Sequence, residues 1–101
     1  LAFFTAPFRV TALRLAGVLV DRRLVACVNM LPQMTAVFRW EGAVETADEV
    51  AMLAKTTAAR VAEIKDVIAA EHPYDTPCLI FTPIADGAPD FLTWIAAETR
   101  S

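Results

Sequence analysis

The apolar positions of the chain follow two kinds of pattern. Short continuous apolar runs of about four to eight residues are typical of buried strands, whereas apolar residues spaced three or four apart are typical of helices. The continuous runs predict strands at residues 1–6, 25–31, 35–40, 43–46, 50–55 and 77–82. The helical spacing predicts helices at residues 9–24, 58–71 and 89–98.

The first predicted helix carries one apolar stripe. The stripe consists of Leu13, Ala16, Gly17, Val20 and Leu24. Charged residues such as Arg14 and Asp21 lie off it. A single apolar stripe is typical of a helix that packs one face against a core, so we expect this stripe to be the buried face.

The middle of the chain predicts a long hairpin. Pro32 lies inside its first arm, and a proline cannot donate a ladder hydrogen bond, so that arm must be bent, bulged or at an edge. Glu41-Gly42 is the turn between the arms, and the second arm extends to Lys55. Such a hairpin is too long for a small domain to cover, so its outer half should project or pair with another chain.

The order of these elements predicts the fold class. Two strand-helix-strand halves joined by the hairpin form the βαββαβ plan of an α+β, ferredoxin-like sandwich, with helices on one face of an antiparallel sheet and an additional C-terminal helix. A length of 101 residues suits one core, so residues 1–101 are expected to form a single domain.

Composition and charge favour an oligomer and argue against two classes of function. The hydrophobic fraction is 56%, against about 45–50% in ordinary globular proteins, which favours an oligomer over a rich monomeric core. The net charge is −3 and there is no basic run, so nucleic-acid binding has no electrostatic support. No apolar stretch approaches the roughly 20 residues of a membrane-spanning helix, so no membrane insertion is expected.

The termini and cysteines indicate a reducing compartment. The N-terminus lacks a secretory signal pattern, and because a strand begins at Leu1 we expect a few natural residues to precede it. Cys27 and Cys78 both lie in apolar runs, so we expect buried free thiols rather than a disulfide. A cytoplasmic protein is the resulting prediction.

Six segments in order resemble the CutA divalent-cation-tolerance family and together cover nearly the whole chain. They are residues 5–7 (TAP), 24–29 (LVACVN), 38–42 (FRWEG), 49–57 (EVAMLAKTT), 72–77 (HPYDTP) and 91–95 (FLTWI). The resemblance implies a ferredoxin-like fold, a tight homotrimer and an association with tolerance of divalent metal ions, copper above all. The trimeric plan also resembles that of PII-type signalling proteins, which bind small ligands in clefts between subunits.

The resemblance places the family's copper ligands on Phe4, Glu71 and Cys78, so that ligand set is not reproduced here. His72, the only histidine, with Cys78 and Glu71 nearby in sequence, is the remaining candidate site for copper or another divalent cation. The alternative is that His72 is a helix-terminal residue bonded to backbone and Cys78 is part of the core.

A second candidate site is a ligand cleft or interface. Trp40, Lys55, Tyr74 and Trp94, with His72, belong to the segments that carry the resemblance and would suit a small anionic ligand between subunits. Alternatively, the aromatic residues anchor a protein interface. With three widely spaced glycines and no paired catalytic groups, the sequence predicts neither an enzyme nor an organic cofactor.

Overall fold

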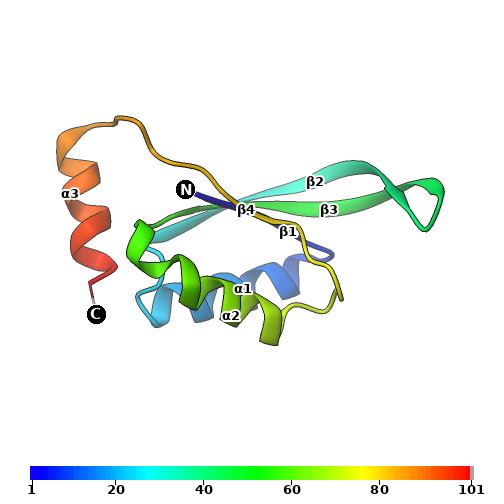
Figure 1. The fold of residues 1–101 in the computed structure, drawn as a ribbon, viewed down its shortest axis with the longest axis horizontal. Helices are drawn as coiled ribbons and strands as arrows, with labels where there is room; N and C mark the ends of the chain where they lie inside the picture. The colour runs from blue at the N-terminus through cyan, green and yellow to red at the C-terminus, as the bar shows by residue number, and fades with distance from the viewer. Residues whose placement is uncertain (101) are drawn as a thin grey trace.

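The computed structural model describes residues 1–100, and its elements follow the predicted order (Figure 1). The strands are β1 (Ala2–Ala6), β2 (Cys27–Trp40), β3 (Ala43–Lys55) and β4 (Leu79–Phe81). The helices are α1 (Arg9–Asp21), α2 (Val61–Glu71), which follows a short 3-10 turn at Ala58–Arg60, and α3 (Pro89–Glu98).

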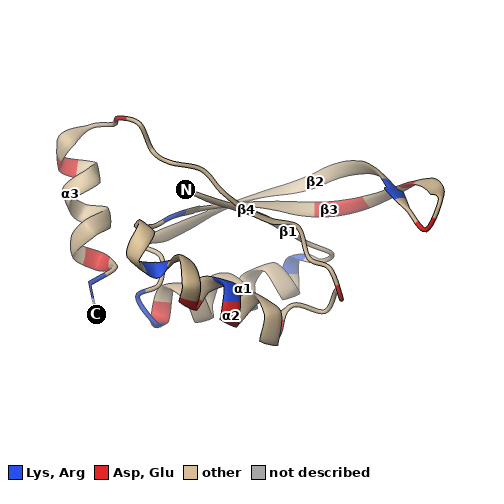
Figure 2. Cartoon of the chain, viewed as in Figure 1, with Lys and Arg blue, Asp and Glu red and all other residues tan. Residues whose placement is uncertain are grey.

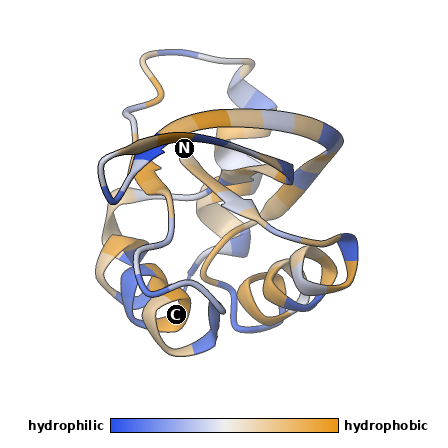
Figure 3. Cartoon of the chain, turned by 90° about the vertical axis from the view of Figure 1, so that its right-hand side faces the viewer, coloured by the Kyte–Doolittle hydropathy of each residue, from blue (hydrophilic) through white to orange (hydrophobic). Residues whose placement is uncertain are grey.

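The four strands form one antiparallel sheet in the order β2-β3-β1-β4. In β1, Phe4 lies between Met52 of β3 and Leu79 of β4. Helices α1 and α2 lie together on one side of this sheet (Figures 1 and 3). The prediction of an α+β, ferredoxin-like fold is therefore confirmed.

The core lies between the sheet and these two helices. Phe4 and Met52 point from the central strands into it, and both are fully buried. The helices contribute their own buried rows, which are Ala12, Leu15 and Leu19 from α1 and Ile64, Val67 and Ile68 from α2. Removing this apolar surface from water stabilises the sandwich by about 25 cal/mol per Å².

The prediction of the buried face of α1 is wrong. The buried row contains Ala12, Leu15 and Leu19, whereas Leu13 and Val20 of the predicted stripe are exposed. This helix is apolar on more than one side, so spacing alone does not distinguish the row that meets the sheet. The helix also ends earlier than predicted, at Asp21, and Arg23 has a φ of 58° before Leu24 enters the core.

The hairpin is more continuous than its sequence pattern indicates, because β2 and β3 each join two of the predicted strands. Strand β2 passes through Pro32 with a register shift between Leu31 and Met34, where Gln33 has a φ of 60°. Because Pro32 lies in this bulge without a register partner in β3, and β2 is an edge strand, the missing proline donor costs no ladder bond in the sheet. The prediction that this arm is bent, bulged or at an edge is thus confirmed, since β2 carries a bulge and lies at the edge.

The outer half of the hairpin projects beyond the helices, as predicted (Figure 1). The positive φ angles of Glu41 (49°) and Gly42 (82°) make the tight turn at its tip. The longest dimension of the molecule is 44 Å and the radius of gyration is 14.1 Å, above the about 13 Å expected for a chain of this length. Val37 and Val44 in this half are two-thirds exposed.

Helix α3 lies at the opposite end of the molecule from the hairpin tip (Figure 1). Two arginines secure its C-terminus, where Arg23 Nη2 donates to the Ala97 carbonyl at 2.8 Å and Arg60 Nε to the Thr99 carbonyl at 2.6 Å. These bonds satisfy carbonyls that the helix itself leaves free. Within residues 1–100, no helix has the length and apolarity needed to cross a membrane.

Candidate functional site

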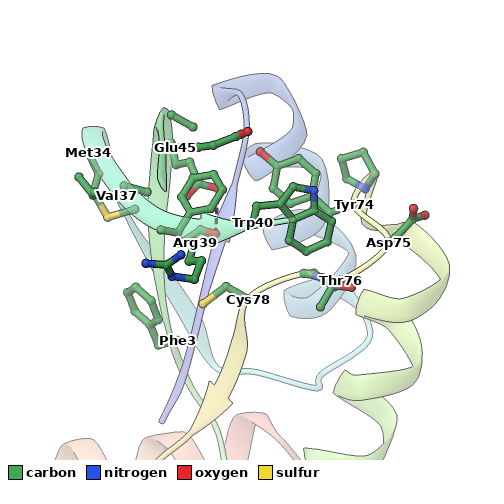
Figure 4. Close-up of a pocket in the computed structure, with 17 residues that line it drawn as sticks. Phe3, Met34, Val37, Arg39, Trp40, Glu45, Tyr74, Asp75, Thr76 and Cys78 are labelled. Carbon is green, nitrogen blue, oxygen red and sulfur yellow. Dashed lines mark hydrogen bonds between the residues drawn. The ribbon is translucent and has the colours of Figure 1, made fainter. Parts of the chain in front are cut away.

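A cleft of about 870 Å³ opens between the hairpin and residues 73–78, the segment that links α2 to β4. Its walls combine aromatic, acidic and sulfur-containing side chains. They include Phe3, Met34, Phe38, Arg39, Trp40, Glu45, Glu49, Tyr74, Asp75 and Cys78. Trp40 and Tyr74, which are drawn above Cys78 in Figure 4, both line the cleft, so residues 34 apart in sequence contribute to it.

Two prolines shape the segment that closes this cleft. Pro73 disfavours helical geometry in the residue before it, and His72 is extended (φ −79°, ψ 138°), which ends α2 at Glu71. Pro77 precedes the three-residue strand β4. The chain between the prolines is therefore neither helix nor strand, and it brings Tyr74 and Cys78 to the cleft.

His72 holds this segment to the sheet. Its ring is buried, its Nε2 lies 2.7 Å from the Thr5 carbonyl, and its Nδ1 accepts a hydrogen bond from the Tyr74 amide at 3.1 Å. A carbonyl accepts only, so Nε2 carries the proton and Nδ1 is the acceptor. Both ring nitrogens are thereby engaged, and the imidazole links β1 to the cleft segment.

Glu49 is one of three carboxylates that line the cleft. Its carboxylate accepts a hydrogen bond from Thr5 Oγ1 at 3.1 Å. Burial raises the pKa of the Tyr74 phenol, and the negative charge of Glu49 raises it further. The same two causes, burial first and Glu49 second, raise the pKa of the Cys78 thiol. The cleft therefore holds both groups in their protonated forms at neutral pH.

Two of the three residues of the predicted metal site have other partners. Glu71 Oε2 accepts from Arg14 Nη1 at 2.9 Å, and His72 is engaged at both nitrogens. Cys78 is exposed, so the prediction of two buried thiols is wrong for it, while Cys27 is half-buried. Among residues 1–100, no three histidine, cysteine, aspartate or glutamate side chains come close enough to hold a metal ion.

The residues of the predicted ligand cleft or interface do not all lie together in the structure. Trp40 and Tyr74 share the cleft. Lys55 lies at the far end of β3, where its Nζ donates to Asn29 Oδ1 and to the Leu53 carbonyl. Trp94 stacks on Phe91 of α3, with ring centroids 5.6 Å apart. Neither Lys55 nor Trp94 lines the cleft of its own chain.

Glu49 was not predicted as a site residue. The signal available in the sequence was the polar interruption Asp48-Glu49 between the two apolar parts of the hairpin's second arm. Such a carboxylate lies where the strand passes from the core to the open surface. A half-buried charge there needs a partner, so the position is worth testing for function.

The family model described as CutA1 divalent ion tolerance protein matches residues 1–98. The chain belongs to this family. The family is named for tolerance of divalent ions rather than for a reaction.

Individual relatives agree with this assignment. The divalent-cation tolerance protein CutA of Archaeoglobus fulgidus is 43% identical over 93 residues, covering 92% of this chain and 90% of that protein. Protein CutA of Mus musculus is 36% identical over 100 residues, and the chain spans only 56% of its length. Among solved structures, the divalent cation tolerance protein (Cut A1) of Thermus thermophilus has a TM-score of 0.96 at 36% identity, covering 98% of this chain and 96% of that one.

Proposed function

We propose that the chain is one subunit of a homotrimeric divalent-cation tolerance protein, in which copper or another divalent cation is the bound ion. The supporting observation is the apolar surface that the single chain leaves open. On the face of the sheet away from the helices lie Phe3, Leu53 and Ile80, which are cross-strand neighbours. Ile80 is 55% exposed, and Leu31 on the same face is 52% exposed.

A closed trimer accounts for this surface. Exposed apolar faces and unpaired strand edges promote association, and closed cyclic symmetry lets each chain cover a neighbour without forming open fibres. The projecting half of the hairpin adds a second region of exposed apolar side chains, with Val37 and Val44 on one of its faces and Trp40 on the other. Both surfaces lie away from α1 and α2, so the proposed interface uses the sheet and the hairpin.

For the metal, we propose His72 with Cys78 and Glu71 as the ligand set to test. Imidazole and thiolate suit copper, and three chains would bring three copies of the set. Ligation requires His72 to release one ring nitrogen from its present hydrogen bond, Glu71 to leave Arg14, and the Cys78 thiol to lose its proton. Copper binding should therefore strengthen as pH rises.

A second candidate function is a PII-like signalling or structural trimer that binds a small ligand or a protein in clefts between subunits. The cleft beside Trp40 and Tyr74 supports this alternative. Its charged lining consists of Glu45, Glu49 and Asp75 against Arg39. An excess of carboxylates favours a cationic ligand over the anionic one that the sequence predicted. Lys55 and Trp94 contribute only if a neighbouring subunit brings them there.

We propose that residues 1–101 act as one domain, that the protein catalyses no reaction and that it works in the cytoplasm, where both thiols stay reduced. The solved structure of the Archaeoglobus fulgidus relative is described as a periplasmic protein, so cell fractionation is the direct test of location.

Two measurements test the proposed function. Light scattering on the purified protein should give a mass of about 33 kDa, three times the 11.0 kDa chain, and a monomer would contradict the trimer. Calorimetry with Cu²⁺ on metal-free protein should show binding that Cys78→Ser and His72→Ala weaken by at least tenfold. Cys27→Ser is the matched control, and equal binding by all variants would exclude this ligand set.

A further inference from the structure

The cleft between the hairpin and residues 73–78 carries more negative than positive charge. Three carboxylates line it, from Glu45, Glu49 and Asp75, against the single guanidinium of Arg39, which leaves two net negative charges. Two of the three lie on β3, where Figure 2 shows acidic positions in the projecting hairpin. A cleft with low-dielectric walls and an excess of one charge concentrates ions of the opposite sign. Its ligand should therefore be a cation.

The cleft carboxylates have no cationic partner in the described chain. None of the salt bridges within residues 1–100 involves Glu45, Glu49 or Asp75. Glu49 accepts a hydrogen bond from Thr5 Oγ1 at 3.1 Å, and a carboxylate has about four acceptor sites, so most of its capacity is free. These groups are available to a ligand that brings its own positive charges.

The two glutamates of β3 lie at a defined separation on one face of the hairpin. Phe38 is the register partner of Glu45 and Met34 that of Glu49, with no irregularity between the two pairs. Side chains alternate between the faces of a strand, so positions 45, 47 and 49 share one face. At about 3.3 Å per residue, the two glutamates are about 13 Å apart along β3. The negative charge is therefore spread along the cleft rather than gathered at one point.

Small and aromatic side chains occupy the space between and beside the glutamates. Ala36 and Ala47 are register partners that both line the cleft, and their short side chains leave room between the longer ones on either side. Phe38 and Trp40 follow on the same face of β2, and Tyr74 lies on the opposite wall. These three rings are 39%, 46% and 39% exposed, so a ligand can reach them. Aromatic faces attract ammonium groups, and the alanines suit methylene groups.

We propose that the cleft binds a linear polyamine, an aliphatic chain with a protonated amine at each end. One end would bind Glu45 beside Phe38 and Trp40, the other would bind Glu49, and the methylene groups would lie over the alanine pair. A chain of nine single bonds of about 1.5 Å spans about 11 Å between its end nitrogens, which suits glutamates about 13 Å apart. The inference rests on the second candidate function, a small ligand in this cleft, and is independent of the copper site.

The test is calorimetry with spermidine on the full chain in its native oligomeric state, free of metal. The expected result is saturable binding that weakens with added salt. Glu45→Gln and Glu49→Gln should each weaken binding by about fivefold, and Glu49→Gln keeps an acceptor for Thr5. Asp48→Asn is the matched control, because it removes the same charge from the same strand on the opposite face, and it should bind normally.

Two further comparisons separate a site from plain charge attraction. Putrescine, a diamine that spans only about 6 Å, reaches one glutamate at a time and should bind about tenfold more weakly than spermidine. Phe38→Leu keeps an apolar side chain but removes the ring, and it should weaken spermidine binding by about threefold. The proposal is overturned if Asp48→Asn weakens binding as much as Glu45→Gln does, or if Mg²⁺ displaces spermidine at equal ionic strength.

Fluorescence distinguishes failure of the polyamine from failure of the cleft itself. In a Trp94→Phe background, Trp40 is the only tryptophan, and its quenching by acrylamide reports whether the cleft is open in the native oligomer. Absence of spermidine binding with an accessible Trp40 overturns the polyamine alone. Absence of binding with a shielded Trp40 overturns the small-ligand cleft as well.

Discussion

Both halves of the β2-β3 hairpin contain apolar strand residues, but these residues have different surroundings. In the inner half, Val50, Met52 and Ala54 are buried against α1 and α2. In the outer half, Val37 and Val44 keep about two-thirds of their surface exposed, although the ladder between the strands continues to the tip. Strand pairing alone therefore does not bury a β-branched residue, because burial requires a second layer.

The first prediction concerns the inner half, where a substitution should change the free energy of unfolding most. Met52→Ala removes a fully buried side chain from the centre of the sheet, so it should lower the free energy of unfolding by about 2–5 kcal/mol. Val44→Ala, in the outer half, should cost about 0.5 kcal/mol or less in the dissociated chain. Urea unfolding of both variants checks the comparison, and similar losses would contradict it.

The second prediction concerns His72, at the border between the core and the cleft. His72→Ala leaves the Thr5 carbonyl and the Tyr74 amide without their partner, which should lower the free energy of unfolding by about 1–3 kcal/mol. Amide hydrogen exchange should then quicken at Tyr74 and stay unchanged at the hairpin tip. Unchanged exchange at Tyr74 would show that His72 does not hold the segment.

The third prediction concerns the tip of the outer half. Gly42 has a φ of 82°, and an added Cβ would meet no atom within 4 Å. Gly42→Ala should therefore cost about 1 kcal/mol through backbone strain alone, without a clash. Thermal unfolding measures the loss. Gly17→Ala, in α1, is the opposite control, because alanine favours the helix and should stabilise it by about 0.5–1 kcal/mol.

The fourth prediction has the smallest effect and concerns Glu49, where the two halves meet. The charge of Glu49 is the second cause, after burial, that raises the pKa of the Cys78 thiol. Glu49→Gln should lower that pKa, so the thiolate fraction and the rate of reaction with a disulfide reagent should rise at about pH 8. Measuring the reaction rate against pH in a Cys27→Ser background isolates Cys78. An unchanged pH profile would show that Glu49 does not raise the pKa of the Cys78 thiol.

Much of the fold was predictable because its signals are local. The proline at position 32, the turn at Glu41-Gly42 and the proline after His72 each restrict the backbone of their own neighbours, and the structure places a bulge, a tight turn and a helix end at those points. The candidate cleft was less predictable. Trp40 and Tyr74 are both predicted from the sequence as site residues, but Glu49, which lines the same cleft, is not.

The sequence by itself determined the order of strands and helices, the hairpin and the family, since each rests on patterns within a few residues of one another. Only the tertiary structure decided which side of α1 is buried, because several of its sides are apolar and the sheet selects one. It also decided that Cys78 is exposed and that His72 bonds to Thr5, 67 residues away. Such contacts depend on how the layers pack, and no local pattern carries that information.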